Sequence, residues 1–206
     1  MKYKTDQELF WAGDFGDNYV DRYKGEVSIA SNTSLFSKIL NSTKSVSTVI
    51  EFGANIGQNL MAIKRLLPNA ELSAVEINEK AANRLKREMQ DVTVYHSSIL
   101  DFSSVDEFDF VLIKGVLIHI DPCELQSVYE LLYKACKKYI CISVYYNPTP
   151  VEVLYRGHEG KLFKRDFAGE LMDRYPDLKL VDYGFVYHRD NNFPLDDATW
   201  FLLEKS

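Results

Sequence analysis

The chain has 206 residues, 46% of them apolar, and a formal net charge of −6. This length and apolar content suffice for one domain with a full hydrophobic core. The acidic balance disfavours a nucleic-acid partner, because a negative surface repels phosphates, although a local basic patch can act against the total.

The N-terminal segment lacks the apolar stretch of a secretory signal, and no run reaches the ~20 apolar residues that span a bilayer. The cysteines, Cys123, Cys136 and Cys141, contain no Cys-x-x-Cys pair and are interpreted as core thiols in a reducing compartment. No cluster has metal-ligand spacing. We therefore expect a cytoplasmic protein without a membrane partner or a metal site.

The N-terminal part of the chain is predicted to combine short helices with a loop. A short helix begins at Asp6, residues 11–17 have the glycines and aromatic residues of a loop, and residues 34–40 are predicted to be helical. The aromatic residues Trp11, Phe15 and Tyr19 are expected either to fold over a ligand as a lid or to pack on the outer face of a sheet.

From residue 47 onward the pattern alternates between strands and helices. The predicted strands are 48–52, 71–76, 92–95, 108–114, 139–145, 178–187 and 199–204. The predicted helices are 57–67, 79–89, 123–136 and 163–175. Alternation with near-continuous apolar strands predicts an α/β, doubly wound, mostly parallel sheet with helices on both faces. After Pro176 only two strands remain, which favours an antiparallel pair at one sheet edge.

The strongest local signal is the segment VIEFGANIG, a buried strand running into a turn and a helix. Gly53 and Gly57 allow a sharp turn and close approach of a ligand. The dinucleotide fingerprint also needs glycine at positions 55 and 58, where the chain has Asn55 and Gln58, and there is no Walker loop. A carboxylate at Glu51, at the end of the strand, would repel a pyrophosphate and attract an ammonium group. S-adenosylmethionine carries both an ammonium and a sulfonium.

The next two strands add groups that suit an adenosine. Glu76 ends the second strand, 19 residues after Gly57, and an acid there is placed to bind ribose hydroxyls of either S-adenosylmethionine or NAD. The loop that starts at Ser98 and Ile99 is suited to hold an adenine ring. The fourth strand ends in Lys114 and Gly115 at the expected cleft.

These features, in this order and spacing, resemble the class I S-adenosylmethionine-dependent methyltransferases over residues 47–145. The resemblance implies a seven-stranded sheet with an antiparallel last strand. It also implies that Glu51, Gly53 and Gly57 line the methionine end and that Lys114 lies beside it. The chain departs from the family at Asn55, where the middle glycine is usual. The cofactor-binding residues predicted in this way are Trp11, Glu51, Gly53, Ala54, Asn55, Gly57, Glu76, Ile77, Ser98, Ile99, Lys114 and Gly115.

A narrower resemblance extends nearly end to end. Segments 10–19, 114–119, 145–150, 155–158 and 163–166 are similar to the methylases encoded with pseudaminic acid biosynthesis in bacteria. This similarity implies that the acceptor is a nonulosonic acid sugar or its nucleotide-linked precursor.

A cluster of basic residues follows the fifth predicted strand. In this topology the segment crosses the mouth of the cleft, where cations bind a carboxylate or phosphate. The alternative is a solvated charge run at a helix start. The predicted substrate-binding residues are Tyr145, Asn147, Arg156, Lys161, Lys164 and Arg165.

Methyl transfer from a sulfonium is an in-line displacement, so the protein mainly positions the acceptor and removes a proton from it. The histidine candidates for the base are His119, His158 and His188, whereas His96 is expected to be structural. The predicted catalytic residues are His119, His158 and Tyr146.

The sequence therefore predicts a single domain over residues 1–206, with N-terminal helices or a lid (1–46), a cofactor-binding core (47–145), and a substrate loop with edge strands (146–206). The expected activity is S-adenosylmethionine-dependent methylation of a small molecule. The alternatives are a non-catalytic S-adenosylmethionine-binding protein and a nicotinamide-dependent sugar oxidoreductase. The oligomeric state is not predicted.

Overall fold

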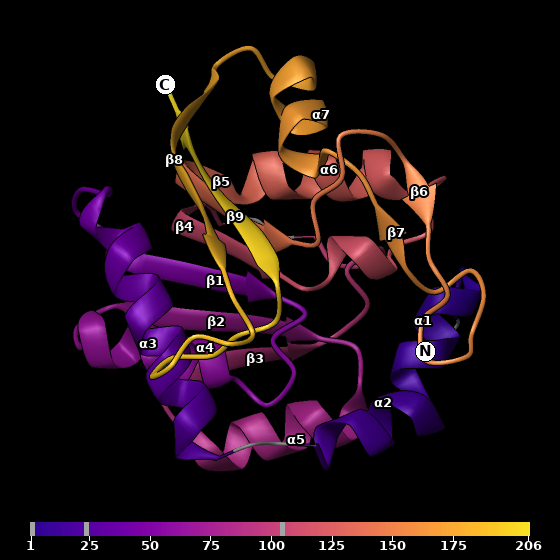
Figure 1. Cartoon of the computed structure of the whole chain (residues 1–206). Coiled ribbons are helices and arrows are strands. Elements are labelled where there is room, and N and C mark those ends of the chain that lie inside the picture. The colour runs from indigo at the N-terminus through magenta and orange to yellow at the C-terminus, as the bar shows by residue number, and fades with distance from the viewer. Residues whose placement is uncertain (1–2, 23–24, 104–105) are drawn as a thin grey trace.

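The computed structural model describes residues 3–22, 25–103 and 106–206, and its centre is a seven-stranded sheet (Figure 1). The strand order is β3-β2-β1-β4-β5-β9-β8. The strands are β1 (Thr48–Phe52), β2 (Glu71–Glu76), β3 (Val92–His96), β4 (Phe108–Lys114), β5 (Cys136–Val144), β8 (Leu178–Val186) and β9 (Ala198–Lys205). Strands β1 to β5 are parallel, and β9 is antiparallel to both β5 and β8. The predicted fold class is confirmed, with the last strand inserted between β5 and β8.

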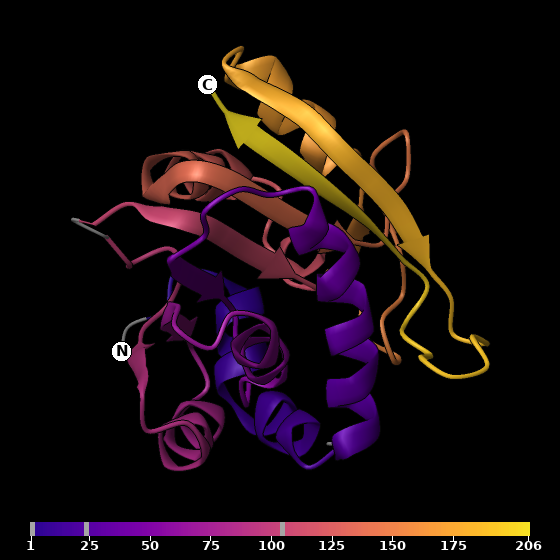
Figure 2. The same ribbon diagram turned by 90° about the vertical axis from the view of Figure 1, so that its left-hand side faces the viewer.

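Helices cover both faces of the sheet, because successive side chains of the buried strands point to opposite sides. One face packs against α3 (Glu26–Asn41), α4 (Gln58–Leu66) and α5 (Glu79–Glu88). The other packs against α6 (Leu125–Ala135) and α7 (Phe167–Arg174). Figure 2 shows α3 and α7 on opposite sides of the sheet.

The expected loop at residues 11–17 is wrong, because the chain there forms two helices, α1 (Asp6–Ala12) and α2 (Asp14–Val20). Gly13 ends the first helix and begins the second. A Cβ on Gly16 would lie 1.8 Å from the Trp11 carbonyl oxygen, so this glycine serves close packing between the helices. The third N-terminal helix begins at Glu26 rather than at residue 34.

The basic segment after β5 forms a hairpin in place of the expected loop. Strands β6 (Val151–Glu152) and β7 (Phe163–Lys164) pair antiparallel, and the tip turns at Arg156 and Gly157, both with positive φ. The following helix therefore begins at Phe167 and not at residue 163. Residues 151–164 are called the basic hairpin below.

The remaining boundaries differ from the predictions by only a few residues. Helix α6 ends at Ala135 and β5 follows at once, so Cys136 belongs to the strand. Cys136 and Cys141 are buried on β5 while Cys123 is exposed. Within the described residues, no helix has the length and apolar character needed to cross a membrane.

A buried carboxylate anchors the start of β4. Asp109 accepts hydrogen bonds from the Ser47 amide (2.9 Å) and hydroxyl (2.6 Å), and its other oxygen lies 3.0 Å from Lys138 Nζ. Burial alone would raise the pKa of Asp109, but the bonds from Ser47 and Lys138 outweigh it and hold the pKa at about 2.

We expect Asp109→Asn to lower the free energy of unfolding at pH 7 by about 1–3 kcal/mol, because charge-assisted bonds are lost at a buried site. The folded pKa is depressed, so this contribution is complete above the unfolded pKa and fades as the pH falls toward 2. Urea unfolding from pH 7 to pH 3 measures it. The exposed acid change Glu130→Gln, which breaks a surface ion pair, is the control. A deficit that stays constant over this pH range would contradict the assignment.

Candidate functional site

A cavity of about 280 Å³ lies at the carboxyl ends of β1, β2 and β4, the edge where open α/β sheets bind ligands. Helices α1 and α2 cover it, and Figure 1 shows α1 and the basic hairpin side by side beyond the strand ends. The predicted site residues in its wall are Trp11, Gly53, Ala54, Asn55, Glu76, Ile77, Ser98, Ile99, Lys114, Gly115 and His119. Glu51 and Gly57 are outside the lining.

The turn after β1 explains its residue types. Gly53, Asn55 and Gly57 all have positive φ, and asparagine tolerates this region better than most residues. The departure at Asn55 is therefore compatible with the turn. A Cβ on Gly57 would lie 2.1 Å from Leu85 Cδ1, so this glycine allows α5 to pack closely.

Glu51 is fully buried beside the cavity. Its Oε1 accepts a hydrogen bond from Asn59 Nδ2 at 2.6 Å, while its Oε2 has no partner. Burial raises the pKa of Glu51 to about 8, although the Asn59 bond and the nearby Lys114 oppose the shift. A buried acid with a free oxygen is suited to a cationic ligand group.

Glu76 lines the cavity at the end of β2. Its two oxygens accept hydrogen bonds from the amides of Asn78 (2.8 Å) and Asn55 (2.6 Å). Burial raises the pKa of Glu76, and these amide bonds oppose the shift. A carboxylate has about four acceptor positions, so Glu76 retains capacity for ligand hydroxyls.

Buried polar atoms without partners gather around the cavity. Such atoms are rare in native proteins and need an explanation. Those on lining residues are Gln7 Oε1, Trp11 Nε1, Asn32 Oδ1, Asn55 Oδ1, Gln58 Nε2 and Asn59 Oδ1. A polar ligand would satisfy them. The donor and acceptor set therefore fits an adenosine bearing an amino acid.

The charge of the cavity wall favours a cation. The acids Glu8, Glu76, Asp121 and Asp196 line it, and Lys114 is the lysine among the described lining residues. Sequence reasoning missed Gln7, Asn32, Gln58, Asn59, Asp121 and Asp196 as lining residues. Their positions depend on contacts between distant segments, and only Gln58 and Asn59 adjoin a motif that the sequence marks.

His119 ends the short 3-10 helix η1 (Leu117–His119) and lines the cavity. Its Nδ1 lies 2.5 Å from the Lys161 carbonyl oxygen, which only accepts, so Nδ1 carries the proton and Nε2 is the basic nitrogen. Its ring lies 4.7 Å from the Trp11 ring and 4.8 Å from the Tyr155 ring, centroid to centroid. Burial lowers the pKa of His119 to about 4, so the ring is neutral near pH 7.

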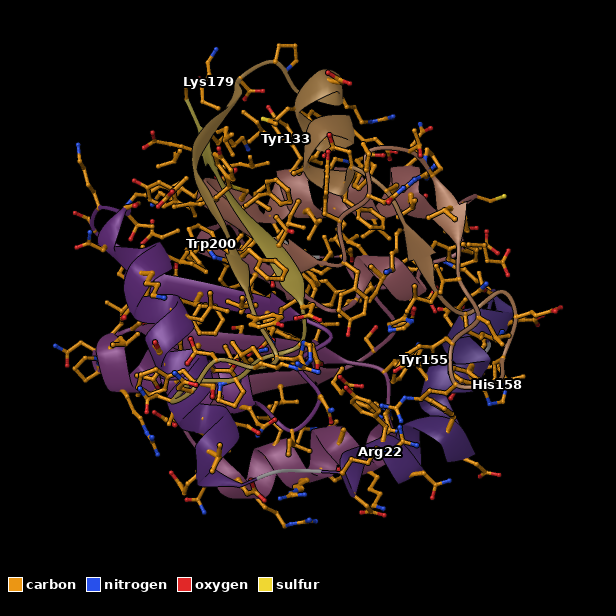
Figure 3. The ribbon with its side chains drawn as sticks, in the orientation of Figure 1. Arg22, Tyr133, Tyr155, His158, Lys179 and Trp200 are labelled. Atoms are coloured by element: carbon orange, nitrogen blue, oxygen red, sulfur yellow. The ribbon has the colours of Figure 1, made fainter. Side chains whose placement is uncertain are left out.

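The two N-terminal helices contact both the cavity and the basic hairpin. Trp11 and Tyr19 line the cavity with ring centroids 5.3 Å apart. Phe10 and Phe15 stack at 4.0 Å and face His158 of the hairpin. Figure 3 shows Tyr155 and His158 beside these helices. These aromatic residues therefore lie at the edge of the sheet that holds the cavity, and not on the outer face of the sheet.

The predicted basic cluster does not converge on the cavity. Arg165 pairs with Glu170 at 3.0 Å. Lys161, Lys164 and Arg156 lie over aromatic rings of Phe10, Tyr145 and Tyr155, respectively, at 5.4–5.7 Å. Lys161 also lines a second, more open hollow, which shares Thr5, Gln7 and Asp121 with the cavity.

The other predicted residues lie away from the cavity lining. Tyr146 is exposed and lies near Phe201, and Asn147 Nδ2 donates to the Thr149 carbonyl oxygen at 2.6 Å. His188 is exposed and pairs with Asp197. His96 Nε2 lies 3.1 Å from the Ile77 carbonyl oxygen. The described residues contain no group of side chains placed to hold a metal ion.

Comparison with known proteins agrees with this geometry. Residues 50–138 match the model of the family described as "Methyltransferase domain". No curated protein is similar to the chain in sequence.

Solved structures share the fold at low sequence identity. The Burkholderia thailandensis 1,6-didemethyltoxoflavin-N1-methyltransferase superposes with a TM-score of 0.72 at 16% identity, covering 100% of this chain and 92% of that one. The magnesium protoporphyrin IX methyltransferase of Synechocystis PCC 6803, crystallised with S-adenosylhomocysteine, has a TM-score of 0.69 at 12% identity and covers 98% and 100%. The N-methyltransferase NodS of Bradyrhizobium japonicum WM9 has a TM-score of 0.66 at 15% identity and covers 88% and 98%.

The family match covers the strands and turns that carry Glu51, Glu76 and Lys114. The cavity there presents acids and unsatisfied polar groups to a ligand. Residues 50–138 of the chain are therefore similar to methyltransferase domains, and the whole chain shares the fold of solved methyltransferases.

Proposed function

We propose that the chain is an S-adenosylmethionine-dependent methyltransferase that acts on an oxygen or nitrogen of a small molecule. We further propose that the acceptor is a nonulosonic acid sugar or its nucleotide-linked form. The observation that supports this acceptor is the second hollow, which lies next to the cavity. Its lining combines two lysines, Lys4 and Lys161, with four acids, and it adjoins the cavity through Thr5, Gln7 and Asp121. A sugar acid bound there would direct its carboxylate to the two lysines and its hydroxyl groups to the neighbouring acids, beside the cavity.

The chain's own residues would hold the cofactor by their chemistry. Glu51 would receive the ammonium group through its unpartnered oxygen, and Glu76 would receive the ribose hydroxyls. Ile99 would contact the adenine, and Lys114 would lie at the methionine end. When bound, S-adenosylmethionine supplies an activated methyl group.

The remaining task is to remove a proton from the acceptor and to exclude water. His119 is the proposed base, since the Lys161 carbonyl fixes its tautomer with Nε2 unprotonated. Trp11 and Tyr155 pack on its ring and shield it from solvent. This arrangement positions the base without a charged partner.

Two of the fold neighbours support a small-molecule acceptor by their names, one a toxoflavin precursor methyltransferase and the other a magnesium protoporphyrin IX methyltransferase. The narrower sugar proposal rests on the sequence resemblance and on the basic hairpin. Tyr145, Lys164 and Arg165 lie on or beside this hairpin and remain proposed substrate contacts, together with Asn147 and Arg156.

We expect His119→Ala to lower kcat by about 10²–10⁴-fold, the usual contribution of a general base. The depressed pKa of His119 places the acid limb of the kcat/KM profile near pH 4 instead of near pH 6.5. The exposed His188→Ala is the matched control and should keep wild-type activity. An acid limb near pH 6.5 would assign the proton transfer to another group.

The test of the acceptor is transfer of a labelled methyl group to a panel of nonulosonic acids and their nucleotide-linked forms. We expect label in at least one sugar. Binding of the cofactor with no transfer to any sugar would reject the sugar acceptor and favour the non-catalytic alternative or another acceptor class. Binding of NADH in place of the cofactor would favour the oxidoreductase alternative.

A further inference from the structure

A buried acid from the N-terminal helix reaches the edge of the cavity where the third strand ends. Glu8 is 7% exposed and lines the cavity together with Ser98 and Ile99. The side chain belongs to a capping box, in which Thr5 and Glu8 satisfy each other's amides at the start of α1. The two sequence segments are 90 residues apart.

The hydrogen bonds of Glu8 leave one acceptor position open. Its Oε2 accepts from the amides of Lys4 (2.5 Å) and Thr5 (3.0 Å). Its Oε1 accepts from the Ser98 hydroxyl. A carboxylate provides about four acceptor positions, so Oε1 can accept one further hydrogen bond.

Ser98 is committed to this carboxylate. Its hydroxyl proton is donated to Glu8, and its oxygen accepts from the Leu100 amide at 3.0 Å. Both bonds fix the Ser98 hydroxyl against Glu8, so Ser98 acts as a positioning residue that orients the Glu8 carboxylate.

We propose that Glu8 is the residue that selects adenine. The inference rests on the proposed placement of the adenine beside Ile99, next to the carboxylate. The exocyclic amino group of adenine donates to the open position on Glu8 Oε1. A hypoxanthine ring presents a carbonyl oxygen at the same place, which would face the carboxylate without a proton between them and bind poorly.

The location of Glu8 on α1 adds a second consequence. The same helix contributes Gln7 and Trp11 to the cavity wall. It is joined to the loop after β3 through the Lys4 ion pair with Asp101 at 2.7 Å. A purine bound to Glu8 would therefore contact helix α1 as well as the loops at the ends of the strands.

The test compares binding of S-adenosylhomocysteine and its deaminated analogue, S-inosylhomocysteine, by calorimetry. We expect the wild-type protein to prefer the adenine ligand at least ~30-fold and Glu8→Gln to reduce this preference at least ~10-fold, consistent with the penalty for an unpaired buried polar group. Glutamine retains the capping box, because its amide oxygen still accepts from the helix start. Its amide nitrogen is also able to donate to the hypoxanthine carbonyl.

Asp6→Asn is the matched control, since Asp6 is an exposed acid in the first turn of the same helix. It should keep the wild-type preference. A Glu8→Gln protein that binds both ligands more weakly in the same proportion would show a structural role only and overturn the assignment. Failure of the wild-type protein to bind S-adenosylhomocysteine at all would reject the cofactor placement, and this result is distinct from a preference that Glu8 does not control.

Discussion

Gly53→Asp is expected to lower the affinity for S-adenosylhomocysteine at least ~100-fold, about 2.7 kcal/mol at 1.36 kcal/mol per tenfold. Gly53 has a φ of 75°, a region that costs other residues about 1–3 kcal/mol. A Cβ there would also lie 2.4 Å from Val116 Cγ2, so the turn that lines the cavity must shift. Calorimetry measures the affinity, and circular dichroism checks that the sheet is retained.

Gly25→Asp separates backbone strain from the effect on the cavity. Gly25 has a φ of 65°, and a Cβ at this position meets nothing within 4 Å. This variant should lose some stability but bind the ligand as the wild type does. Equal affinity of Gly53→Asp and wild type would mean that the turn after β1 does not carry the cofactor.

Glu51→Gln is expected to stabilise the ligand-free protein and to weaken cofactor binding at the same time. The folded pKa of about 8 is raised, so between the ordinary carboxyl pKa and pH 8 the unfolded chain loses a proton that the folded protein keeps. Stability therefore falls as the pH rises through this window and levels off above it. Removing the acid should raise the free energy of unfolding at pH 8 by about 1–3 kcal/mol, with part of the gain offset by the unpaired glutamine amide.

The same substitution removes the carboxylate proposed to hold the ammonium group, and the affinity should fall at least ~10-fold. Wild-type binding below pH 8 should release a proton, which calorimetry in buffers of different ionisation enthalpy detects. Glu71→Gln, at an exposed position on β2, should change neither property. Unchanged stability together with unchanged affinity would show that Glu51 is neither strained by burial nor used in binding.

The central sheet was predictable because its strands carry a strong local signal. Apolar runs such as those of β1, β4 and β5 are buried on both faces. Gly53 follows β1 directly, and Glu76 is the last residue of β2. The position of the cavity was predictable for the same reason, since it is built at the ends of these strands, but its lining was predictable only in part: it omits Glu51 and Gly57 and includes Asn32 and Asp196.

Helices α1 and α2 and the basic hairpin were not predictable from the sequence, because their structure depends on contacts with residues far away in the chain. Gly16 looks like a loop residue in sequence, yet it serves a contact with the Trp11 backbone. The basic hairpin lacks a long alternating pattern and is held by pairs such as Gln7 with the Gly160 carbonyl at 2.9 Å. The approach of Glu8 to Ser98 has no local signal at all.

The position of β9 in the sheet sets an order on the assembly of the protein. The strand that comes last in sequence lies between β5 and β8, and the connection that precedes it brings Asp196 to the cavity. Until β9 has left the ribosome, the edge of β5 that faces away from β4 has unpaired backbone groups, and the cavity lacks Asp196. A nascent chain that ends before this strand therefore presents an open sheet edge to chaperones and to other chains.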